Sequence, residues 1–434
     1  MSGIQASSFT VPRTGAHPVP AATARSVHAI VAVSIGNALE WFDIVIYGFL
    51  AATIAKVFFP VGNETVSMLV TLGTFGASFL MRPLGSVVIG GYADRAGRKK
   101  ALTLSIGLMM LGTLVIAILP GYASIGLAAP VLLTGARLLQ GFSAGGEFGS
   151  ATAFLAEQNP ARRGFYSSWQ FASQGLTTLL ASGFGVALST LMAPADLVAW
   201  GWRIPFFFGL LVGPVALYIR STLEEGGEFQ AATPAEAPIQ SALATQKGRM
   251  LAGMGLIVLA TVSAYTMLFM PTFAARQLGL PPSAGFWATL LFGTLQFLLC
   301  PIFGKLSDRI GRVPLMATAA AVMMLAIIPL FALLLASPTP ATMLLVQACM
   351  AVIAAGYVGP VSAAMSELFP ASMRSTGLSI SYSFGVAIFG GFAPFIVAWL
   401  IAATGSNLAP GFYVAFGAAL SLIALVATRR FGVR

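Results

Sequence analysis

The feature that most limits what this chain can fold into is a series of long apolar stretches, each about long enough to cross a lipid bilayer. They do not alternate strictly between apolar and polar residues, as the strands of a membrane β-barrel do. Inside a bilayer a helix satisfies its own backbone hydrogen bonds, so the stretches predict transmembrane helices. At about 20 residues per span, the sequence predicts twelve. They cover roughly residues 28–56, 66–92, 101–120, 126–156, 165–191, 203–220, 249–275, 284–304, 314–336, 341–367, 375–403 and 410–429.

Composition and charge support this class and argue against a soluble, nucleic-acid-binding protein. Hydrophobic residues make up 57% of the chain and charged residues 8%, whereas ordinary soluble proteins carry about 25% charged residues. The net charge is +10, but most Lys and Arg residues fall in loops on one side of the predicted spans. This positive-inside pattern predicts a multi-pass membrane protein with both termini in the cytoplasm. The basic loops would then face anionic lipid headgroups.

Two matching pairs of motifs indicate an internal duplication. The loops GGYADRAGRK and GKLSDRIGRV share the pattern Gly-x-x-x-Asp-Arg-x-Gly-Arg, and their Asp94 and Asp308 are 214 positions apart. Glu157 and Glu367, each three residues before a proline, are 210 positions apart. The similar offsets predict an all-α membrane protein of two pseudo-symmetric six-helix halves. The predicted organisation is a disordered cytoplasmic tail (1–26), an N-terminal bundle (27–221), a cytoplasmic linker (222–247) and a C-terminal bundle (248–434).

The repeated loops are also candidate gates. Their glycines allow a tight turn, and their Asp and Arg residues can cap helix ends or pair with charges on neighbouring helices. Such a clamp can be purely structural, but at an interface that moves it would hold one conformation closed. The candidate gating residues are Gly90, Asp94, Arg95, Gly97, Arg98, Gly304, Asp308, Arg309, Gly311, Arg312, Glu157, Glu367 and Arg374.

The first predicted span contains two carboxylates, in the stretch GNALEWFDIVIYG. A charge at the bilayer centre costs at least ~2.5 kcal/mol, so such residues face a cavity or a partner helix. Asn37, Glu40, Asp43 and Tyr47 recur every three or four residues, which predicts one polar stripe on the helix. The acids could form a static buried ion pair, or one of them could carry a proton, since burial and nearby cations change the pKa of a carboxyl group. We favour the proton-carrying role, and Asp43 slightly over Glu40.

Two arginines also fall inside predicted spans. Arg137 and Glu147 both belong to the fourth span, about 15 Å apart along a helix. Arg82 directly precedes a proline in the second span. Its planar guanidinium could bind a carboxylate of a substrate in a bidentate manner, or it could extend to the membrane interface. All of these deep charges lie in the first half, which therefore is expected to provide proton coupling and anion recognition.

The candidate residues fall into two groups. The predicted proton-coupling residues are Glu40, Asp43, Arg137 and Glu147. The predicted substrate-binding residues are Asn37, Tyr47, Arg82, Arg137, Gln140, Trp169, Gln170, Gln174, Tyr265, Tyr357 and Tyr382. The residues of the second group that lie in the C-terminal half are uncharged, so that half is expected to supply shape and hydrogen bonds. The sequence shows no spacing typical of a metal site or of a catalytic nucleophile, so no metal, cofactor or enzymatic activity is expected.

Further motifs extend along the whole chain: GNALEWFD (36–43), FLMRPLG (79–85), RLLQGFSAGGEFG (137–149), WGWRIPF (200–206) and SELFPASMRSTG (366–377). Together with the repeated loops, they resemble the major facilitator superfamily and, within it, the metabolite–proton symporter family. The resemblance is nearest to symporters of citrate and other organic acids. It implies alternating access and a pair between Arg137 and an acid of the first span that opens when the acid is protonated.

The expected function is therefore import of a small organic anion, a di- or tricarboxylate such as citrate, together with protons as the coupling ion. Two deep arginines suit an anionic substrate, and three deep acids supply proton sites. One alternative is a proton symporter of the same family for a zwitterion or another polar metabolite, such as betaine, proline or shikimate. Another is a drug–proton antiporter. The expected partners are the substrate, protons and the lipid bilayer, and a monomer is the default.

Overall fold

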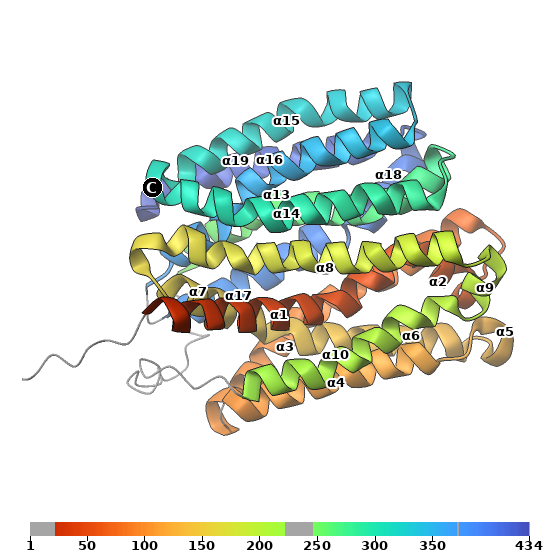
Figure 1. Ribbon diagram of the computed structural model, residues 1–434, viewed down its shortest axis with the longest axis horizontal. Helices are drawn as coiled ribbons and strands as arrows, with labels where there is room; N and C mark the ends of the chain where they lie inside the picture. Colours follow the sequence, from red (N-terminus) through yellow and green to blue (C-terminus); the bar gives the residue numbers. More distant parts are fainter. Residues whose placement is uncertain (1–21, 97, 222–245, 371–372, 434) are drawn as a thin grey trace, which may run out of the picture.

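The computed structural model describes residues 22–96, 98–221, 246–370 and 373–433, which form helices joined by short turns, without a β-strand among them (Figure 1). The helices of the first half are α1 (Ala22–Phe49), α2 (Ala51–Phe58), α3 (Glu64–Ala96), α4 (Arg98–Ile118), α5 (Tyr122–Ile125), α6 (Ala128–Ser143), α7 (Glu147–Glu157), α8 (Arg163–Leu191), α9 (Pro194–Ala199) and α10 (Ile204–Ser221). Those of the second half are α13 (Lys247–Gln277), α14 (Pro282–Ile310), α15 (Arg312–Ala336), α16 (Pro340–Leu368), α17 (Arg374–Gly385), α18 (Ala393–Thr404) and α19 (Ala409–Thr428).

Each of the twelve predicted spans falls on one long helix or on two consecutive helices. By length and apolar composition alone, eight helical stretches of the described ranges can cross a membrane, and the pair α1–α2, bent by 66°, adds a ninth. The remaining spans of the twelve-helix fold are α4, the broken α6–α7 pair and α10. The predicted tail and linker fall largely outside the described residues, although α1 already begins at Ala22.

The two halves lie side by side, with their helices roughly parallel along the long axis of the molecule (Figure 1). Helix α8 of the first half runs along α14 of the second half, and this is the most extensive contact between them. Helix α7 packs against α17, and α1 contacts α13. The interface is therefore formed by helices from both ends of the sequence, and a site at the centre takes side chains from each half.

Glycines allow α8 and α14 to approach closely. A Cβ atom on Gly175 would lie 2.6 Å from the backbone nitrogen of Phe297, and one on Gly293 would lie 2.7 Å from that of Leu179. Near the start of α8, Gly164 faces Gly304 in the same way. Because there is no side chain at these positions, the two backbones are in contact, as at the small-residue interfaces of other membrane helices.

The eleventh span is interrupted by a π-helical segment, Val386–Gly391, between α17 and α18. Glycines of this segment place its backbone against the side chains of two other helices. Gly390 contacts Tyr265 of α13, and Gly391 contacts Phe79 of α3. π-Helical segments often occur at functional sites, and this one lies against two aromatic residues beside the central cavity described below.

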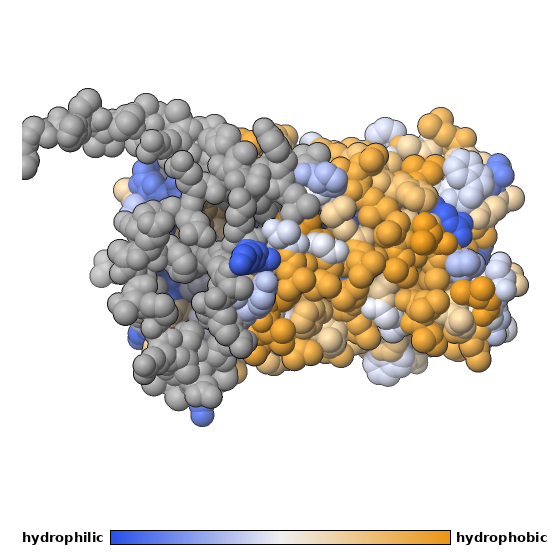
Figure 2. All heavy atoms as spheres, turned by 90° about the horizontal axis from the view of Figure 1, so that it is seen from below, coloured by the Kyte–Doolittle hydropathy of each residue, from blue (hydrophilic) through white to orange (hydrophobic). Residues whose placement is uncertain are grey.

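The outer surface is apolar over much of its length. Figure 2 shows one face on which hydrophobic side chains form a broad band, with many of the hydrophilic ones at the end of the molecule away from the grey atoms. Large aliphatic residues of this kind include Leu211 and Leu325, which are 73% and 71% exposed. Such a surface would be a liability in water and is suited to contact with lipid.

The close contact between α8 and α14 predicts a difference between two glycines of the same helix. Gly175→Ala should lower the thermal midpoint of the purified protein by several degrees, because the added methyl group meets backbone atoms and overpacking costs about 1–3 kcal/mol. Gly183→Ala is the matched control, since a Cβ there meets nothing within 4 Å. It should leave the midpoint unchanged or raise it, since alanine favours helix. Equal midpoints would contradict the close packing.

Candidate functional site

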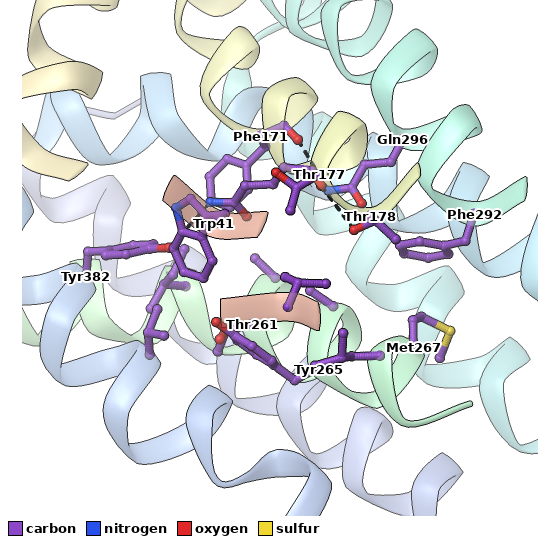
Figure 3. A pocket seen from close by; sticks show the side chains of 17 residues that line it. Trp41, Phe171, Thr177, Thr178, Thr261, Tyr265, Met267, Phe292, Gln296 and Tyr382 are labelled. Atoms are coloured by element: carbon purple, nitrogen blue, oxygen red, sulfur yellow. Dashed lines mark hydrogen bonds between the residues drawn. The ribbon is translucent and has the colours of Figure 1, made fainter. Parts of the chain in front are cut away.

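A cavity lies between the two halves at the centre of the bundle (Figure 3). Its polar lining residues come from helices of both halves. They include Gln174, Thr178, Thr261, Tyr265, Gln296 and Tyr382. The volume is about 50 Å³, which is room for a few water molecules and much less than the usual site of a small-molecule ligand. The halves are therefore closed around the centre in this structure, and they would have to separate to admit an organic ligand.

Arg82 of α3 lies beside this cavity, between aromatic rings. Its Cζ atom is 4.3 Å from the centroid of Trp41, a lining residue, and 4.5 Å from that of Phe79. At these distances the face of a ring attracts a cation. Arg82 is only 2% exposed, so it does not extend to the surface here. Its Nε and Nη2 atoms have no hydrogen-bond partner among the described residues. Such a guanidinium is costly to bury, and an anionic ligand would compensate it.

Other hydrogen-bonding groups line the same region. The hydroxyl groups of Thr261 and Tyr265, both on α13, lack partners within the described part of the chain. The Tyr382 hydroxyl accepts a hydrogen bond from Nε2 of Gln174 at 3.5 Å, which joins the two halves across the cavity. The structure thus brings four predicted substrate-binding residues together, Arg82 and Gln174 from the first half and Tyr265 and Tyr382 from the second.

Arg137 of α6 belongs to a second, fully buried group. Its Cζ atom is 4.5 Å from the ring centroid of Tyr47 and 5.4 Å from that of Phe75. Nη1 donates to Oε1 of Gln140 at 2.8 Å, and Nη2 donates to the Ser78 hydroxyl at 3.3 Å. The arginine is 0% exposed. Its positive charge is therefore held by aromatic faces and neutral acceptors.

Asp43 of α1 is linked to this arginine indirectly. Its Oδ2 accepts a hydrogen bond from the Thr113 hydroxyl at 2.5 Å, and Thr113 in turn accepts one from Nε2 of Gln140 at 2.9 Å. The other oxygen, Oδ1, faces Gly209 of α10 and lacks a partner among the described residues. The resemblance implied a pair between Arg137 and one of the two acids of the first span, and Asp43 does not contact Arg137 directly in this structure. Two neutral side chains, Gln140 and Thr113, separate the charges.

Three polar residues of the stripe predicted on α1 contact different neighbouring helices. Asn37 donates to the Ser173 hydroxyl of α8 at 2.7 Å, Asp43 faces α4, and the Tyr47 hydroxyl donates to the carbonyl of Thr71 on α3 at 3.3 Å. At 3.6 residues per turn, positions 37 and 43 lie about 120° apart on a helix. These residues therefore contact three different helices, and they do not face one common cavity.

The remaining predicted site residues lie elsewhere. Gln170 exchanges hydrogen bonds with α1, Tyr357 donates to a backbone carbonyl of α13 at 2.7 Å, and Trp169 packs against a ring of α14. None of these three lines the cavity. Glu40 is half-buried. The side chain of Glu147 is outside the described residues.

Several residues of the site were not predicted from the sequence, among them Thr113, Thr261 and Trp41. Thr113 and Thr261 are single hydroxyl groups in apolar helices, where threonine usually bonds to a carbonyl of its own helix. Trp41 stands next to Glu40 in a motif that was singled out for its charges. Only the packing of neighbouring helices shows that these side chains face the cavity or Asp43. In the described residues, no cluster of three or more His, Cys, Asp or Glu side chains could hold a metal ion.

Asp308 of α14 caps a helix of the opposite half. Its Oδ1 accepts a hydrogen bond from the backbone N–H of Gly164 at 2.8 Å, and its Oδ2 accepts one from that of Phe165 at 3.0 Å. These N–H groups begin α8, where the helix dipole favours a negative charge. Arg312 pairs with Asp308 at 2.7 Å and with Glu367 at 3.3 Å. One cluster thus joins the halves at the end of the bundle that carries the second repeated loop.

Further ion pairs cross between the halves. Glu157 pairs with Arg374 at 2.6 Å at the same end, and Glu64 pairs with Arg276 at 3.5 Å at the opposite end. Gly311 has a φ of 96°, as the tight turn of the second loop requires. Gly304 faces α8, and Arg309 is exposed. The candidates of the first loop, Gly90, Asp94, Arg95, Gly97 and Arg98, lie outside the residues whose side chains the structure describes.

Comparison with known proteins gives consistent matches along the chain. Family models match residues 28–235, "Sugar (and other) transporter", and residues 251–432, "Major Facilitator Superfamily". The citrate-proton symporter of Klebsiella pneumoniae is 39% identical and covers 92% of this chain and 90% of its own length. The proline/betaine transporter of Salmonella typhimurium is 34% identical, and the match covers 91% of this chain and 82% of that transporter. The solved structure of the proton:xylose symporter XylE, at 16% identity, gives a TM-score of 0.74 over 95% of this chain and 96% of that one.

Two six-helix halves, a central cavity with polar groups from both halves and ion pairs across both ends define a multi-pass membrane transporter. The chain belongs to the major facilitator superfamily. Within the superfamily it is a member of the metabolite–proton symporter family, as the sequence motifs predicted.

The cap on α8 predicts the effect of removing the charge of Asp308. Asp308→Asn should loosen that end of the bundle, because a charged helix cap contributes about 1 kcal/mol. With the reporter substitution Ser168→Cys at a buried position, in a background without Cys300 and Cys349, the reporter thiol should then react faster with a membrane-impermeant thiol reagent. Lys305→Gln, which removes an exposed charge of α14, is the control. Equal labelling rates in both variants and the parent would rule out a closing role for this cap.

Proposed function

We propose that the protein is a proton-coupled symporter that imports a small organic anion, a di- or tricarboxylate such as citrate, by alternating access. It would act in a bacterial inner membrane with both termini in the cytoplasm, as a monomer, without an enzymatic step or a cofactor. The observation that carries the proposal is Arg82, a buried cation with unpaired donors beside a cavity between the halves. The 39% identity to a citrate-proton symporter supports the substrate class.

An anionic substrate fits the chemistry around Arg82. A carboxylate can accept two hydrogen bonds from the planar guanidinium, and the rings of Trp41 and Phe79 hold that plane in place. The hydroxyl groups of Thr261 and Tyr265 can donate to further oxygens of the ligand. A compound with two or three carboxyl groups would use the cation of one half and the hydroxyl groups of the other.

Asp43 is the best candidate for the proton site. It is 5% exposed, and its charge is opposed by Arg137 only through Gln140 and Thr113. A buried carboxylate without a direct cation is costly when ionised, so binding a proton would relieve that cost as the loaded carrier changes conformation. Glu40 and Glu147 remain further candidates for the same role.

Gating would follow from the contacts at the two ends. Breaking the Asp308 cap and the Glu157–Arg374 pair would open the cytoplasmic end, and breaking the Glu64–Arg276 pair would help to open the outer end. Each set of charged groups becomes hydrated when it separates, so neither opening leaves a charge buried. The central cavity would then be reached from one side at a time.

A second candidate is a symporter for a zwitterion such as betaine. The observation in its favour is the aromatic part of the cavity wall, Trp41, Tyr265 and Tyr382, because ring faces attract quaternary ammonium groups. The 34% identity to a proline/betaine transporter is compatible with it. Counterflow of labelled citrate and labelled betaine into proteoliposomes decides between the two.

Replacing Arg82 tests anion recognition. Arg82→Lys should raise the half-saturation concentration for citrate counterflow about tenfold, since a point charge replaces a bidentate donor and one lost charged hydrogen bond costs about 1.4 kcal/mol or more. Arg203→Lys, at an outer turn where the guanidinium binds backbone carbonyls, is the control and should not change it. An unaltered half-saturation value in Arg82→Lys would exclude Arg82 from the binding site.

Replacing Asp43 tests proton coupling. The amide of Asp43→Asn mimics the protonated acid, so the loaded carrier can still cycle while the empty carrier loses proton control. Exchange of substrate across the vesicle membrane should persist and depend less on pH, whereas accumulation driven by a pH gradient should disappear. Both assays are run on one preparation, with Glu40→Gln in parallel. If neither variant separates exchange from accumulation, the proton does not bind at these two carboxylates.

A further inference from the structure

The Thr113 hydroxyl group has three hydrogen-bonding neighbours, two of which can accept a hydrogen bond, but it has only one hydrogen to donate. It lies 2.5 Å from Oδ2 of Asp43, 2.9 Å from Nε2 of Gln140 and 3.0 Å from the carbonyl oxygen of Met109. A hydroxyl group has one hydrogen to donate and two lone pairs to accept. Thr113 can therefore donate to Asp43 or to Met109, but not to both. The residue is 0% exposed, so bulk water does not compete for these bonds.

We infer that Thr113 is a positioning residue that couples the protonation of Asp43 to the arrangement of Gln140 and Arg137. The inference rests on the proposed proton symport and extends it to a residue outside the predicted site. When Asp43 is ionised, Thr113 donates to Oδ2 and accepts from Gln140. When Asp43 is protonated, its O–H donates to Thr113, whose own hydrogen turns to the carbonyl of Met109. The heavy atoms need not move, because all three distances already allow hydrogen bonds.

The geometry fixes which oxygen of Asp43 takes part. Oδ1 lies against the backbone of α10, at a point where a side chain in place of Gly209 would collide with it. Oδ2 is the oxygen that faces a hydroxyl group able both to donate and to accept. The carboxyl group thus packs against α10 through Oδ1. Through Oδ2 it either accepts a hydrogen bond from Thr113 of α4 or, when protonated, donates one to it.

The chain of donors points from Arg137 to Asp43. Arg137 donates to Gln140, Gln140 donates to Thr113, and Thr113 donates to the ionised carboxylate. Each bond is strengthened by the charges at the two ends. When Asp43 becomes neutral and Thr113 reverses its hydrogen, the chain no longer ends on an anion. Arg137 then loses the negative charge at the far end of this chain, and it interacts more strongly with other groups.

Those other groups connect to the cavity. Arg137 lies over the ring of Phe75, and that ring is 5.9 Å, edge to face, from Tyr265 in the cavity wall. On neighbouring helices of the described structure, Arg137 is the ionisable group that acts on Asp43, while α4 and α10 contribute Thr113 and Gly209. On α1 itself, Tyr47 lies against Arg137, and Glu40 is the other acid. The proton site is thus linked to the cavity wall through Arg137, Phe75 and Tyr265.

Two substitutions separate the hydroxyl group from the shape of the side chain. Thr113→Val keeps the branched shape and removes the hydroxyl group, whereas Thr113→Ser keeps the hydroxyl group and removes a methyl group. Thr134→Val on α6 is the control, because its hydroxyl bonds only to the carbonyl of Pro130 in its own helix. All variants are purified and reconstituted into liposomes beside the parent.

The first measurement needs no substrate. The infrared carbonyl band of protonated Asp43, identified by its loss in Asp43→Asn, is followed as pH is varied. Thr113→Val should change the band frequency and displace the titration midpoint by about one pH unit or more, because the hydrogen bond to the ionised carboxylate is lost. Thr113→Ser and Thr134→Val should keep the parent values. An unchanged midpoint in Thr113→Val, equal shifts in Val and Ser, or no titrating Asp43 band in the parent would each overturn the inference.

The second measurement compares transport by the same preparations. Thr113→Val should retain exchange of labelled citrate but lower accumulation driven by a pH gradient about tenfold. Thr113→Ser should accumulate citrate to the level of the parent. Accumulation equal to that of the parent in Thr113→Val would overturn the coupling role. If the parent does not transport citrate but its Asp43 titration depends on Thr113 as described, the substrate assignment fails and the inference about Thr113 stands.

Discussion

The cost of keeping charge inside the membrane shapes the centre of this molecule. Arg137 and Asp43 are both buried, and neither is neutralised by direct contact with the other. A direct buried pair would be costly to break, because separation leaves each charge uncompensated. A path through Gln140 and Thr113 holds the charges more weakly, so that one proton can change the balance. This arrangement suits a carrier that must visit several states of similar free energy.

Charge and hydrogen-bonding capacity are divided between the halves. The first half contributes the deep cations, among them Arg82, and the second half contributes uncharged hydroxyl groups such as those of Thr261 and Tyr265. An anion bound to both would draw the halves together around itself. Substrate binding and closure of the cavity would then be one event, which is how a ligand can bias a conformational equilibrium through its contacts with each state.

Much of the fold could be predicted because apolar length and repeated motifs report directly on spans and duplication. Breaks within spans, such as the π-helical segment Val386–Gly391, could not be predicted, since straight and broken helices have the same apolar composition. Arg82 and Asp43 could be singled out as candidates from the sequence because a charge in an apolar stretch is conspicuous. Thr113 could not, because its role depends on which helix it faces. The neighbours of the polar residues on α1 could not be predicted for the same reason: sequence spacing gives the angle between side chains but not the helices that they contact.

The contact between α8 and α14 affects how fast such a carrier could turn over. Helices whose side chains interlock resist tilting, because the side-chain ridges of one helix must leave the grooves of the other before the helices can pack again. Where Gly175 and Gly293 bring two bare backbones together, there is little to disengage. Part of the resistance to tilting then comes from charged contacts at the two ends, and dissolved salt weakens the exposed Glu64–Arg276 pair most. The speed of the carrier would therefore respond to the ionic strength at the end of the bundle that carries this pair.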